Sequence, residues 1–439
     1  MLKKYIIFLL LIFLILSCGS DYMLSSFYIR NNDLKWQLSP SEQKELNYYT
    51  HIVGGNNFNE YNSPVILATP KNYILSIYEN RSTYTTSIFA VDGQQTVNVK
   101  IAISKNAEDF SVGKNVSEIG YNPTYSHGSP IGFVDKNGNV IVLAVGGVGF
   151  GSGDSKDISK IDMSISTNDG YDWSEWTNIV DTNIFKPLLD EGYNRFYTTS
   201  GKGITLQNGT LVCMIDYKKH TTSGYNPEGA AILYSKNNGK DWQLGATMKY
   251  TGGASGKRFA RIIVERSDGK LLIAAVHNTG DDYNANGSLY WALADSLDGT
   301  ISDFTVTGLP NNSGGNVSGD KITFSKNGQL INGILLVHST PDRIYKNPNG
   351  VDFIVENSMS ISMSEDEGKS WTLIKDAFGS PANKTSFRHD IKVLKDGTIV
   401  VVGEEGNNIS ITSQQTFNVV YRRMGLYLLS DGKYQYEGL

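Results

Sequence analysis

Cysteine and proline are scarce in this chain, which has two cysteines and eleven prolines among its 439 residues. A single cysteine beyond residue 18 cannot form an intramolecular disulfide, so packing must hold the folded chain together. Basic residues are few as well: 39 Lys and Arg against 44 Asp and Glu give a net charge of −5. This balance argues against nucleic acid as a partner, because phosphate binding needs clustered positive charge. Six scattered histidines without a His-x-x-x-His spacing predict neither a metal site nor a cofactor.

A long apolar run occurs at the N-terminus. Two lysines precede the apolar residues 5–16, a run that is short for a membrane span and ends in Ser-Cys-Gly. This order is typical of a secretory signal, and the cysteine after Leu-Ser resembles the lipidation site of bacterial lipoproteins. We therefore expect residues 1–18 to be a lipoprotein signal peptide with Cys18 as its lipidation site, and residues 19–45 to be a tether. An ordinary signal peptide that happens to contain a cysteine is the alternative.

The lipoprotein interpretation predicts where the protein resides. It would be exported and anchored to a membrane through its N-terminal lipid, on the bacterial cell surface or on the periplasmic face. The sequence does not distinguish the two membrane leaflets.

Glycine (45 residues) and tyrosine (25 residues) are abundant, a mixture that suits strands joined by tight turns. An apolar run, a short polar turn and a second apolar run recur with a period of roughly 65 residues. Most of these turns are Asn-Gly or Asp-Gly, which favour β-hairpins because both turn residues take positive φ. The six predicted hairpins cover residues 64–78, 130–145, 203–215, 261–276, 321–337 and 390–403.

Each hairpin is followed by a strand that ends in a Ser-led turn. Three of these turns share the pattern Ser-x-Asn/Asp-x-Gly-x-x-Trp, and three are degraded. The clean copies are STNDGYDW (166–173), SKNNGKDW (235–242) and SEDEGKSW (364–371). We interpret this octapeptide as structural: Asn or Asp bonds nearby backbone N–H groups, Gly takes the left-handed corner, and Trp packs between strands. Four strands per period, repeated six times, predict an all-β, six-bladed β-propeller over residues 46–439.

The octapeptide is the Asp box, and its recurrence in a six-bladed propeller resembles the bacterial exo-sialidase (neuraminidase) family over about residues 55–437. The resemblance implies a glycoside hydrolase that releases terminal sialic acid or a related acidic sugar. It also implies an arginine triad that grips the substrate carboxylate, a Tyr–Glu pair that supplies the nucleophile, and an Asp as general acid/base. Asp boxes occur in other propellers too, so they specify the fold more closely than the activity.

The family's site residues carry over unevenly in blade one. The family's Glu-Gly-Arg matches Glu79-Asn-Arg81, and the resemblance implies that this arginine reaches the ring substituents of the sugar. Asp92 falls close to the position of the general acid/base. The family's Tyr-Arg-x-Pro reads Tyr-Asn-Ser-Pro here, so Asn62 stands where the first arginine belongs.

The later blades depart further from the family pattern. Blade four begins with Arg258-Phe-Ala-Arg261 where the family has a glutamate. The second arginine of the triad falls near a Val-His pair. The third falls on a glutamate, unless Arg343 takes its part across an insertion. Blade six opens with Arg388-His389 where the nucleophilic tyrosine of Tyr-Ser-x-Leu is expected.

Independently of the resemblance, the starts of the six hairpins are expected to line one mouth of the propeller. Positive side chains gather at these starts although the whole chain is acidic, which predicts an anionic ligand. We expect Asp92, Arg388 and Arg261 to be the catalytic candidates. The substrate-binding candidates are Arg81, Glu79, Asn62, Arg258, Arg343 and His389.

Three functions are therefore open. The first is a sialidase-like hydrolase acting as a monomer on sialylated or other acidic glycans. The second is a glycan-binding or adhesion lipoprotein with impaired catalysis, and the third is a hydrolase with a different acidic substrate and a rearranged pocket. A tyrosine within hydrogen-bond reach of a glutamate at the mouth would favour hydrolysis.

Overall fold

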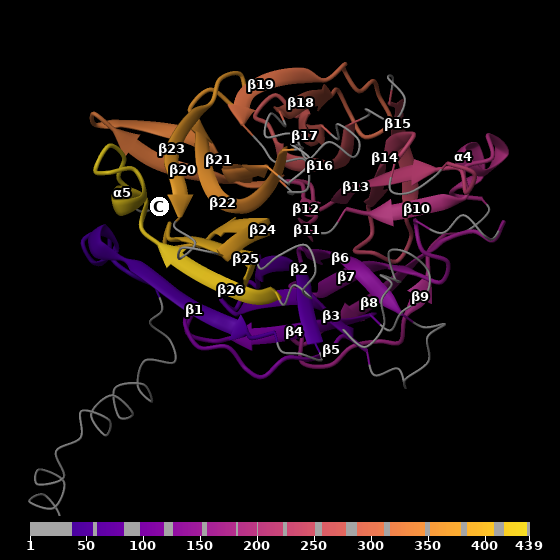
Figure 1. Ribbon diagram of the computed structural model, residues 1–439, viewed down its shortest axis with the longest axis horizontal. Helices are drawn as coiled ribbons and strands as arrows, with labels where there is room; N and C mark the ends of the chain where they lie inside the picture. Colours follow the sequence, from indigo (N-terminus) through magenta and orange to yellow (C-terminus); the bar gives the residue numbers. More distant parts are fainter. Residues whose placement is uncertain are drawn as a thin grey trace, which may run out of the picture. The chain divides into compact units, whose positions relative to one another are not determined.

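Six small sheets follow one another along the chain and form a ring (Figure 1). The computed structural model describes residues 37–55, 59–82, 97–117, 126–151, 156–180, 183–199, 201–222, 226–250, 257–277, 288–310, 317–346, 352–378, 384–407 and 417–436. The predicted signal peptide, Cys18 and Asp92 lie outside these residues. The sequence predicts a propeller from residue 46, and the compact unit of the structure begins at Leu38.

Each sheet is one blade, with strands in antiparallel order from the axis outward. Blades one and two contain β2 (Asn59–Ala68), β3 (Ile74–Ser82), β4 (Val97–Ser104), β5 (Lys114–Asn115), β6 (His127–Val134), β7 (Val140–Gly146), β8 (Lys160–Ser166) and β9 (Thr177–Asn178). Blades three and four contain β10 (Arg195–Thr198), β12 (Ile204–Thr205), β13 (Leu211–Lys218), β14 (Gly229–Ser235), β15 (Gln243–Lys249), β16 (Lys257–Glu265), β17 (Leu271–His277), β18 (Ser288–Ala294) and β19 (Thr305–Pro310).

Blades five and six complete the ring. They contain β20 (Val317–Lys326), β21 (Gln329–Lys346), β22 (Asp352–Ser364), β23 (Thr372–Phe378), β24 (Lys384–Val393), β25 (Ile399–Asn407), β26 (Phe417–Met424) and β1 (Asn47–Val53). Short helices lie outside the sheets: η1 (Glu42–Glu45), α4 (Lys186–Asp190) and α5 (Leu426–Leu429). The predicted all-β, six-bladed propeller is confirmed. Five predicted hairpins fall on the first two strands of a blade, and the hairpin of blade three falls on β12 and β13, after β10.

The first strand of the chain closes the ring. β1 pairs with β26 as the outermost strand of blade six, so indigo and yellow ribbons lie side by side in Figure 1. The segment before β1 also packs on this blade: the Leu38 N–H donates to Asp396 at 3.0 Å, and Gln43 Nε2 donates to the Asp396 carbonyl at 2.6 Å. Closure by the N-terminal strand protects the β26 edge from unwanted pairing.

The Asp-box turns hold neighbouring blades together. In the first copy the Ser166 hydroxyl accepts the Gly170 N–H at 2.9 Å, and Asn168 accepts the Asp172 N–H at 2.8 Å. Gly170 has φ of +85°, and a Cβ there would lie 2.8 Å from Ile101 of the preceding blade. The copies at 235–242 and 364–371 repeat these bonds and this close approach. The octapeptide therefore needs glycine both for the turn and for the contact between blades.

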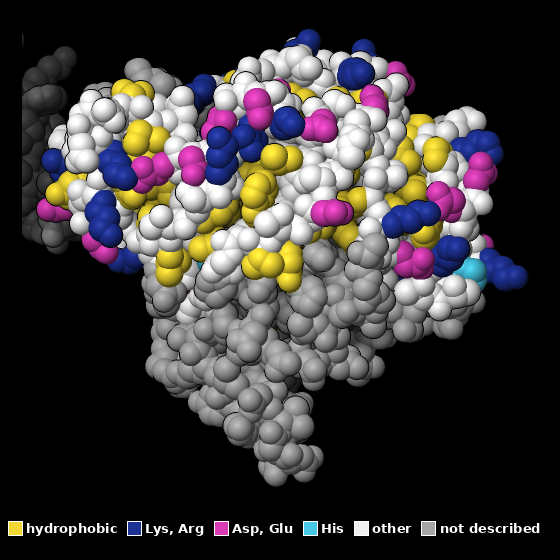
Figure 2. All heavy atoms as spheres, turned by 90° about the horizontal axis from the view of Figure 1, so that it is seen from above, with side chains coloured by type: hydrophobic (Ala, Val, Ile, Leu, Met, Phe, Trp, Pro, Cys, Tyr) yellow, Lys and Arg dark blue, Asp and Glu magenta, His cyan; other side chains and the backbone are white. Residues whose placement is uncertain are grey.

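Apolar layers fill the seams between blades. Separate clusters of buried side chains join blade one to two, two to three, three to four, four to five, and five to six. On the face seen in Figure 2, basic and acidic side chains are intermixed over the described surface. Within the described ranges, the structure has no helix with the length and apolar character that a membrane span requires.

Candidate functional site

Four of the innermost strands contain a bulge near the mouth. The pairing register shifts between Asn62 and Val65 in β2, and at the corresponding places in β6, β16 and β24. Three bulges hold a residue with positive φ: Ser63 (53°), Ser129 (51°) and Arg388 (43°). A bulge re-aims side chains, and positive φ at a residue other than glycine is a local strain that the surroundings must support.

A buried carboxylate supports the bulge at the seam between blades six and one. Glu404 on β25 is 1% exposed and accepts the Ser63 N–H at 2.5 Å. It also accepts both bonds from Nη1 of Arg388, at 3.0 and 3.2 Å. Burial raises the pKa of Glu404, and the Arg388 charge and the Ser63 bond oppose that rise. The carboxylate thus fixes one guanidinium and one strained backbone N–H.

The next seam repeats this construction. Glu79 on β3 is fully buried, accepts the Ser129 N–H, and pairs with Arg81, whose Nε donates at 2.6 Å. In each case the glutamate lies on the second strand of one blade and the bulged residue on the first strand of the next. The two glutamates therefore occupy equivalent places in blades six and one, whereas Arg388 lies on a first strand and Arg81 on a second strand.

Arg388 keeps an open edge at the mouth. Its Nη1 donates to Glu404 and, at 3.2 Å, to Oδ1 of Asn62, whereas Nε and Nη2 have no partner among the described residues. The side chain is 33% exposed. Burial would lower the pKa of Arg388, but the charge and hydrogen bond of Glu404, together with the charges of Tyr197 and Glu79, outweigh it and hold the pKa above its ordinary value. Arg388 is therefore a fixed cation with donors left for a ligand.

Tyr197 on β10 adds a phenol to this cluster. Its oxygen accepts a bond from the Ser129 hydroxyl at 3.1 Å, and its ring lies 5.2 Å from that of Phe150. Burial raises the pKa of Tyr197, while the charges of Arg388 and Arg81 act to lower it. Blades six, one, two and three thus each contribute side chains to one polar cluster, which we call the mouth cluster: Asn62, Ser63, Glu79, Arg81, Ser129, Tyr197, Arg388 and Glu404.

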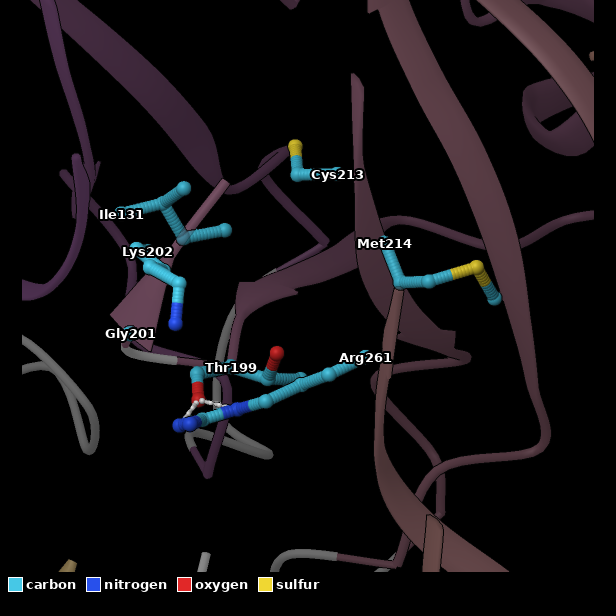
Figure 3. Close-up of a pocket in the computed structure, with 7 residues that line it drawn as sticks. All are labelled: Ile131, Thr199, Gly201, Lys202, Cys213, Met214 and Arg261. Carbon is cyan, nitrogen blue, oxygen red and sulfur yellow. Dashed lines mark hydrogen bonds between the residues drawn. The ribbon is translucent and has the colours of Figure 1, made fainter. Parts of the chain in front are cut away.

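Arg261 lies deeper and is occupied by backbone carbonyls. Its Nε donates to the Thr199 carbonyl at 3.1 Å, its Nη2 donates to the same oxygen, and its Nη1 donates to the Val317 carbonyl at 3.1 Å. It is 6% exposed, and burial lowers its pKa to about 10. Figure 3 shows the guanidinium against Thr199, beside a cavity of about 10 Å³, which is room for about one water molecule. Arg261 joins blades three, four and five.

His389 faces a different seam from Arg388. Its Nε2 bonds the Ser386 hydroxyl at 2.8 Å, and its ring lies over Gly403, where a Cβ would approach within 2.4 Å. Burial, with the charge of Arg422 and the nearby ring of His338, lowers the pKa of His389 to about 3. The imidazole is therefore neutral and is not brought into the mouth cluster.

Two further candidates are described only through their backbone. Arg258 pairs with Val276 between β16 and β17, and Arg343 pairs with Glu356 between β21 and β22. Their side chains lie outside the described part of the structure. Of the nine predicted site residues, the structure brings Asn62, Glu79, Arg81 and Arg388 together.

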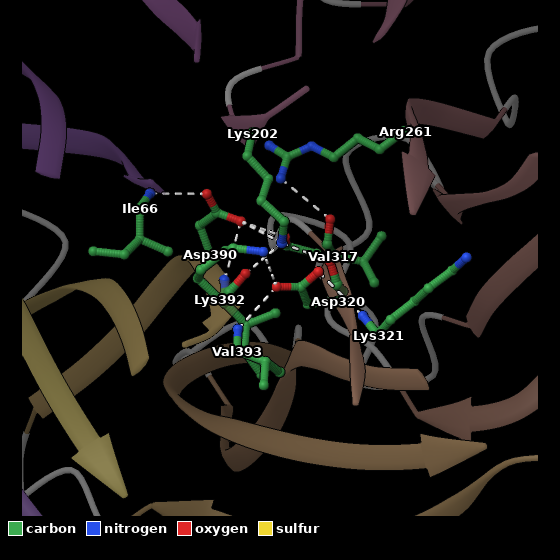
Figure 4. A network of polar contacts seen from close by, with 12 residues as sticks. Ile66, Lys202, Arg261, Val317, Asp320, Lys321, Asp390, Lys392 and Val393 are labelled. Carbon is green, nitrogen blue, oxygen red and sulfur yellow. Dashed lines mark hydrogen bonds and ion pairs between the residues drawn. The ribbon is translucent and has the colours of Figure 1, made fainter. Parts of the chain in front are cut away.

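A second polar network joins strands of several blades around Lys202 and Asp390 (Figure 4). The innermost strand of blade three breaks after β10, and β11 (Gly201–Lys202) pairs in parallel with β6 of blade two. Lys202 then reaches across the axis: its Nζ donates to the Gly319 carbonyl at 2.5 Å and lies 3.6 Å from Asp390. Asp390 in turn accepts the Ile66 N–H at 2.9 Å and the Ser318 hydroxyl. These bonds join blades one, two, three, five and six.

Four members of the mouth cluster were not predicted from the sequence: Glu404, Tyr197, Ser63 and Ser129. Glu404 had a usable signal, because it is half of an acidic pair at the end of an apolar strand, where a buried charge implies a partner. Ser63 and Ser129 act mainly through backbone N–H groups, and no residue-type pattern marks that role. Tyr197 is one of 25 tyrosines and lies outside the predicted hairpins.

Comparison with known proteins identifies the architecture. Residues 72–284 match the family model described as a BNR repeat-like domain. A search of curated proteins found no significant match.

Solved structures resemble this propeller at low sequence identity. A Hadza microbial sialidase has a TM-score of 0.60 and 18% identity, over 84% of this chain and 66% of that chain. The intramolecular trans-sialidase from Ruminococcus gnavus has a TM-score of 0.62 and 14% identity, over 86% and 98%. Trypanosoma rangeli sialidase with the inhibitor DANA has a TM-score of 0.61 and 12% identity, over 90% and 61%. The chain thus has the six-bladed propeller fold of these sialidases, and about half of its length matches a BNR repeat-like domain.

Proposed function

We propose that this protein is a sialidase-like glycoside hydrolase that releases terminal sialic acid, or a related acidic sugar, from glycoconjugates. The observation that carries the proposal is the open edge of Arg388. Its Nε and Nη2 are left free among the described residues while Glu404 and Asn62 hold Nη1. A planar guanidinium edge binds a carboxylate through two parallel bonds, which is the recognition that an acidic sugar requires.

The rest of the mouth cluster can supply chemistry to a sugar held there. We assign Tyr197 as the candidate nucleophile, because its hydroxyl lies beside Ser129 in the mouth cluster and the charges of Arg388 and Arg81 oppose the rise in its pKa that burial causes. Asp92 remains the candidate general acid. Arg81 donates to the buried Glu79 carboxylate, which holds the guanidinium in one position from which it would contact the sugar.

Glycan binding without turnover is the second candidate, and specific features favour it. Asn62 stands where the sialidase family has the first arginine of its triad. Arg261 donates its hydrogen bonds to backbone carbonyls of neighbouring blades, so these donors do not reach a ligand. Among the described residues, the path from Tyr197 to Glu79 runs through Ser129. A glutamate that does not contact the tyrosine directly is a poor base for it. In either case, we propose that the protein is an exported lipoprotein anchored through Cys18.

Hydrolysis of a fluorogenic α-linked sialoside tests the proposal. The protein starting at Gly19 is compared with Arg388→Ala and with Arg422→Ala, an arginine on the other face of blade six that pairs with Glu405. We expect Arg388→Ala to lower kcat/KM at least about 30-fold, since losing a charge-assisted pair costs about 2–5 kcal/mol. Arg422→Ala is expected to retain activity in whatever fraction remains folded.

The outcomes separate the two candidate functions. Turnover that depends on Arg388 supports the hydrolase. Sialyl-glycan binding that depends on Arg388, without turnover, rejects hydrolysis and supports the binding protein. The absence of both turnover and sialyl-glycan binding rejects both candidate functions.

A further inference from the structure

We propose that binding of an acidic sugar at the mouth cluster is coupled to uptake of one proton by Glu404, so that affinity falls as pH rises. The inference rests on the proposed recognition of a carboxylate and does not require hydrolysis. Four groups face Glu404 from the elements packed against it: Arg388 from β24, Asn62 and Ser63 from β2, and Arg81 from β3.

In the unliganded site one guanidinium balances one buried carboxylate. Glu404 is 1% exposed, so water does little to stabilise its charge. Arg388 provides its direct ionic contact, through Nη1 alone. Arg81 is bonded to its own partner, Glu79, and cannot turn toward Glu404 without leaving that carboxylate unpaired. The positive charge of Arg388 is thus already balanced by the Glu404 carboxylate.

A ligand carboxylate on Nε and Nη2 of Arg388 would make two anions share one cation. Like charges in a poorly solvated place disfavour the ionised form of each, and the group that can still take up a proton does so. The carboxylate of a sialic acid is the stronger acid of the two, because Glu404 already has a pKa above its ordinary value through burial. Glu404 is therefore the group that gains the proton.

The sign of the pH dependence follows from this difference. If the ligand raises the pKa of Glu404, it binds the protonated form more tightly. Affinity is then highest below the pKa of the free protein, decreases up to tenfold per pH unit between the free and bound values, and levels off above the bound value.

The neighbouring residue Glu405 provides a matched control. It is also 1% exposed, but it lies on the opposite face of β25, where it accepts from Tyr49 Oη at 3.1 Å and lies 3.8 Å from Arg422. A ligand on Arg388 would leave its surroundings unchanged. Glu404 and Glu405 thus lie on the same strand and are equally buried, but they face different seams between blades.

Isothermal titration calorimetry with DANA tests the inference on the protein starting at Gly19. Titrations between pH 5 and 8, in two buffers of different ionisation enthalpy, measure the number of protons taken up. We expect uptake approaching one proton in the unmodified protein and in Glu405→Gln. We expect none in Glu404→Gln, whose affinity is expected to be independent of pH.

A second measurement avoids any dependence on a folded variant. The methyl ester of DANA has no carboxylate charge, so we expect the unmodified protein to bind it without proton uptake. Binding of DANA without uptake, or uptake that persists in Glu404→Gln, overturns the coupling and leaves the proposed recognition intact. Failure to bind DANA at any pH overturns both.

Discussion

Three of the predicted arginines have different roles because their hydrogen-bond donors are used differently. Arg261 gives all three guanidinium nitrogens to carbonyls of neighbouring blades, and Arg81 gives two to Glu79. Arg388 gives only Nη1, because Glu404 approaches from one side. The chemical type of the residue is the same in each case. The availability of its hydrogen-bond donors decides which one can bind a ligand.

At the same scale, His389 makes folding sensitive to pH. Its pKa is about 3 in the folded protein and about 6.5 in an unfolded chain. Below pH 6.5 the unfolded chain therefore takes up a proton that the folded protein does not. The stabilisation is complete above pH 6.5 and decreases as pH falls toward 3, by about 1.4 kcal/mol per pH unit.

We expect His389→Gln to remove this contribution, which is about 2 kcal/mol between pH 6.5 and pH 5. The free energy of urea unfolding at pH 7.5, 6.5, 5.5 and 5.0 measures it. His51→Gln, which changes an exposed imidazole, is the control and is expected to behave as the unmodified protein does. Equal pH slopes for the unmodified protein and His389→Gln would contradict the assignment.

At the scale of elements, the bulges decide where site residues point. Ser63 and Ser129 occupy positive φ on the first strands of blades one and two, and each gives its N–H to a glutamate of the preceding blade. The strand pattern in the sequence predicts these strands and their apolar faces correctly. It does not reveal the bulges, because the extra residue is specified by a partner more than 300 positions away in the case of Ser63 and Glu404.

A pair of substitutions at Ser63 tests the support of the bulge. Ser63→Pro removes the N–H that Glu404 accepts and requires φ near −65° where the strand has 53°. We expect it to lower the free energy of unfolding by at least about 3 kcal/mol. Ser63→Gly keeps the N–H and tolerates positive φ, so we expect a change within about 1 kcal/mol.

Urea denaturation of the two variants provides the measurement. The comparison isolates the backbone bond and the φ angle, because both substitutions remove the hydroxyl. Equal stability of Ser63→Pro and Ser63→Gly would show that the Glu404 bond does not hold the bulge.

At the scale of the whole molecule, the ring is closed at its rim by β1 and at its centre by charge. The Asp390 carboxylate joins blade six to blades one and five, and Lys202 brings blade three into the same network. Burial lowers the pKa of Lys202, and the charge of Asp390 opposes that change. A charge this deep is stable only while its partner is present.

A double-mutant cycle measures this coupling. We expect Asp390→Ala to destabilise the protein by about 3–5 kcal/mol, because Lys202 is left buried without a carboxylate. Lys202→Met is expected to cost less, since Asp390 keeps its bonds to Ile66 and Ser318. The double variant is expected to lose at least about 1 kcal/mol less than the sum of the single variants. Additive losses, measured by urea unfolding, would mean that the two side chains act independently.

Local patterns in the sequence are sufficient to predict the architecture of this protein. The six hairpins, the Asp-box turns and the period that makes six blades are local patterns, and each depends on residues within a few positions of one another. The pairing of Glu79 with Arg81 is of the same kind, because two residues of one strand separated by one position share a face.

Which of the predicted residues form a site depends on contacts between blades that are far apart in the sequence. Arg388 joins Asn62 across the seam between the last blade and the first, and Arg261 bonds carbonyls between blades instead of joining them. Glu404 enters from the second strand of blade six, and Tyr197 enters from a strand outside the predicted hairpins. The physical reason is that a buried charge takes whatever partner the packing places within about 3 Å. That partner is set by the closed ring and not by the neighbouring sequence.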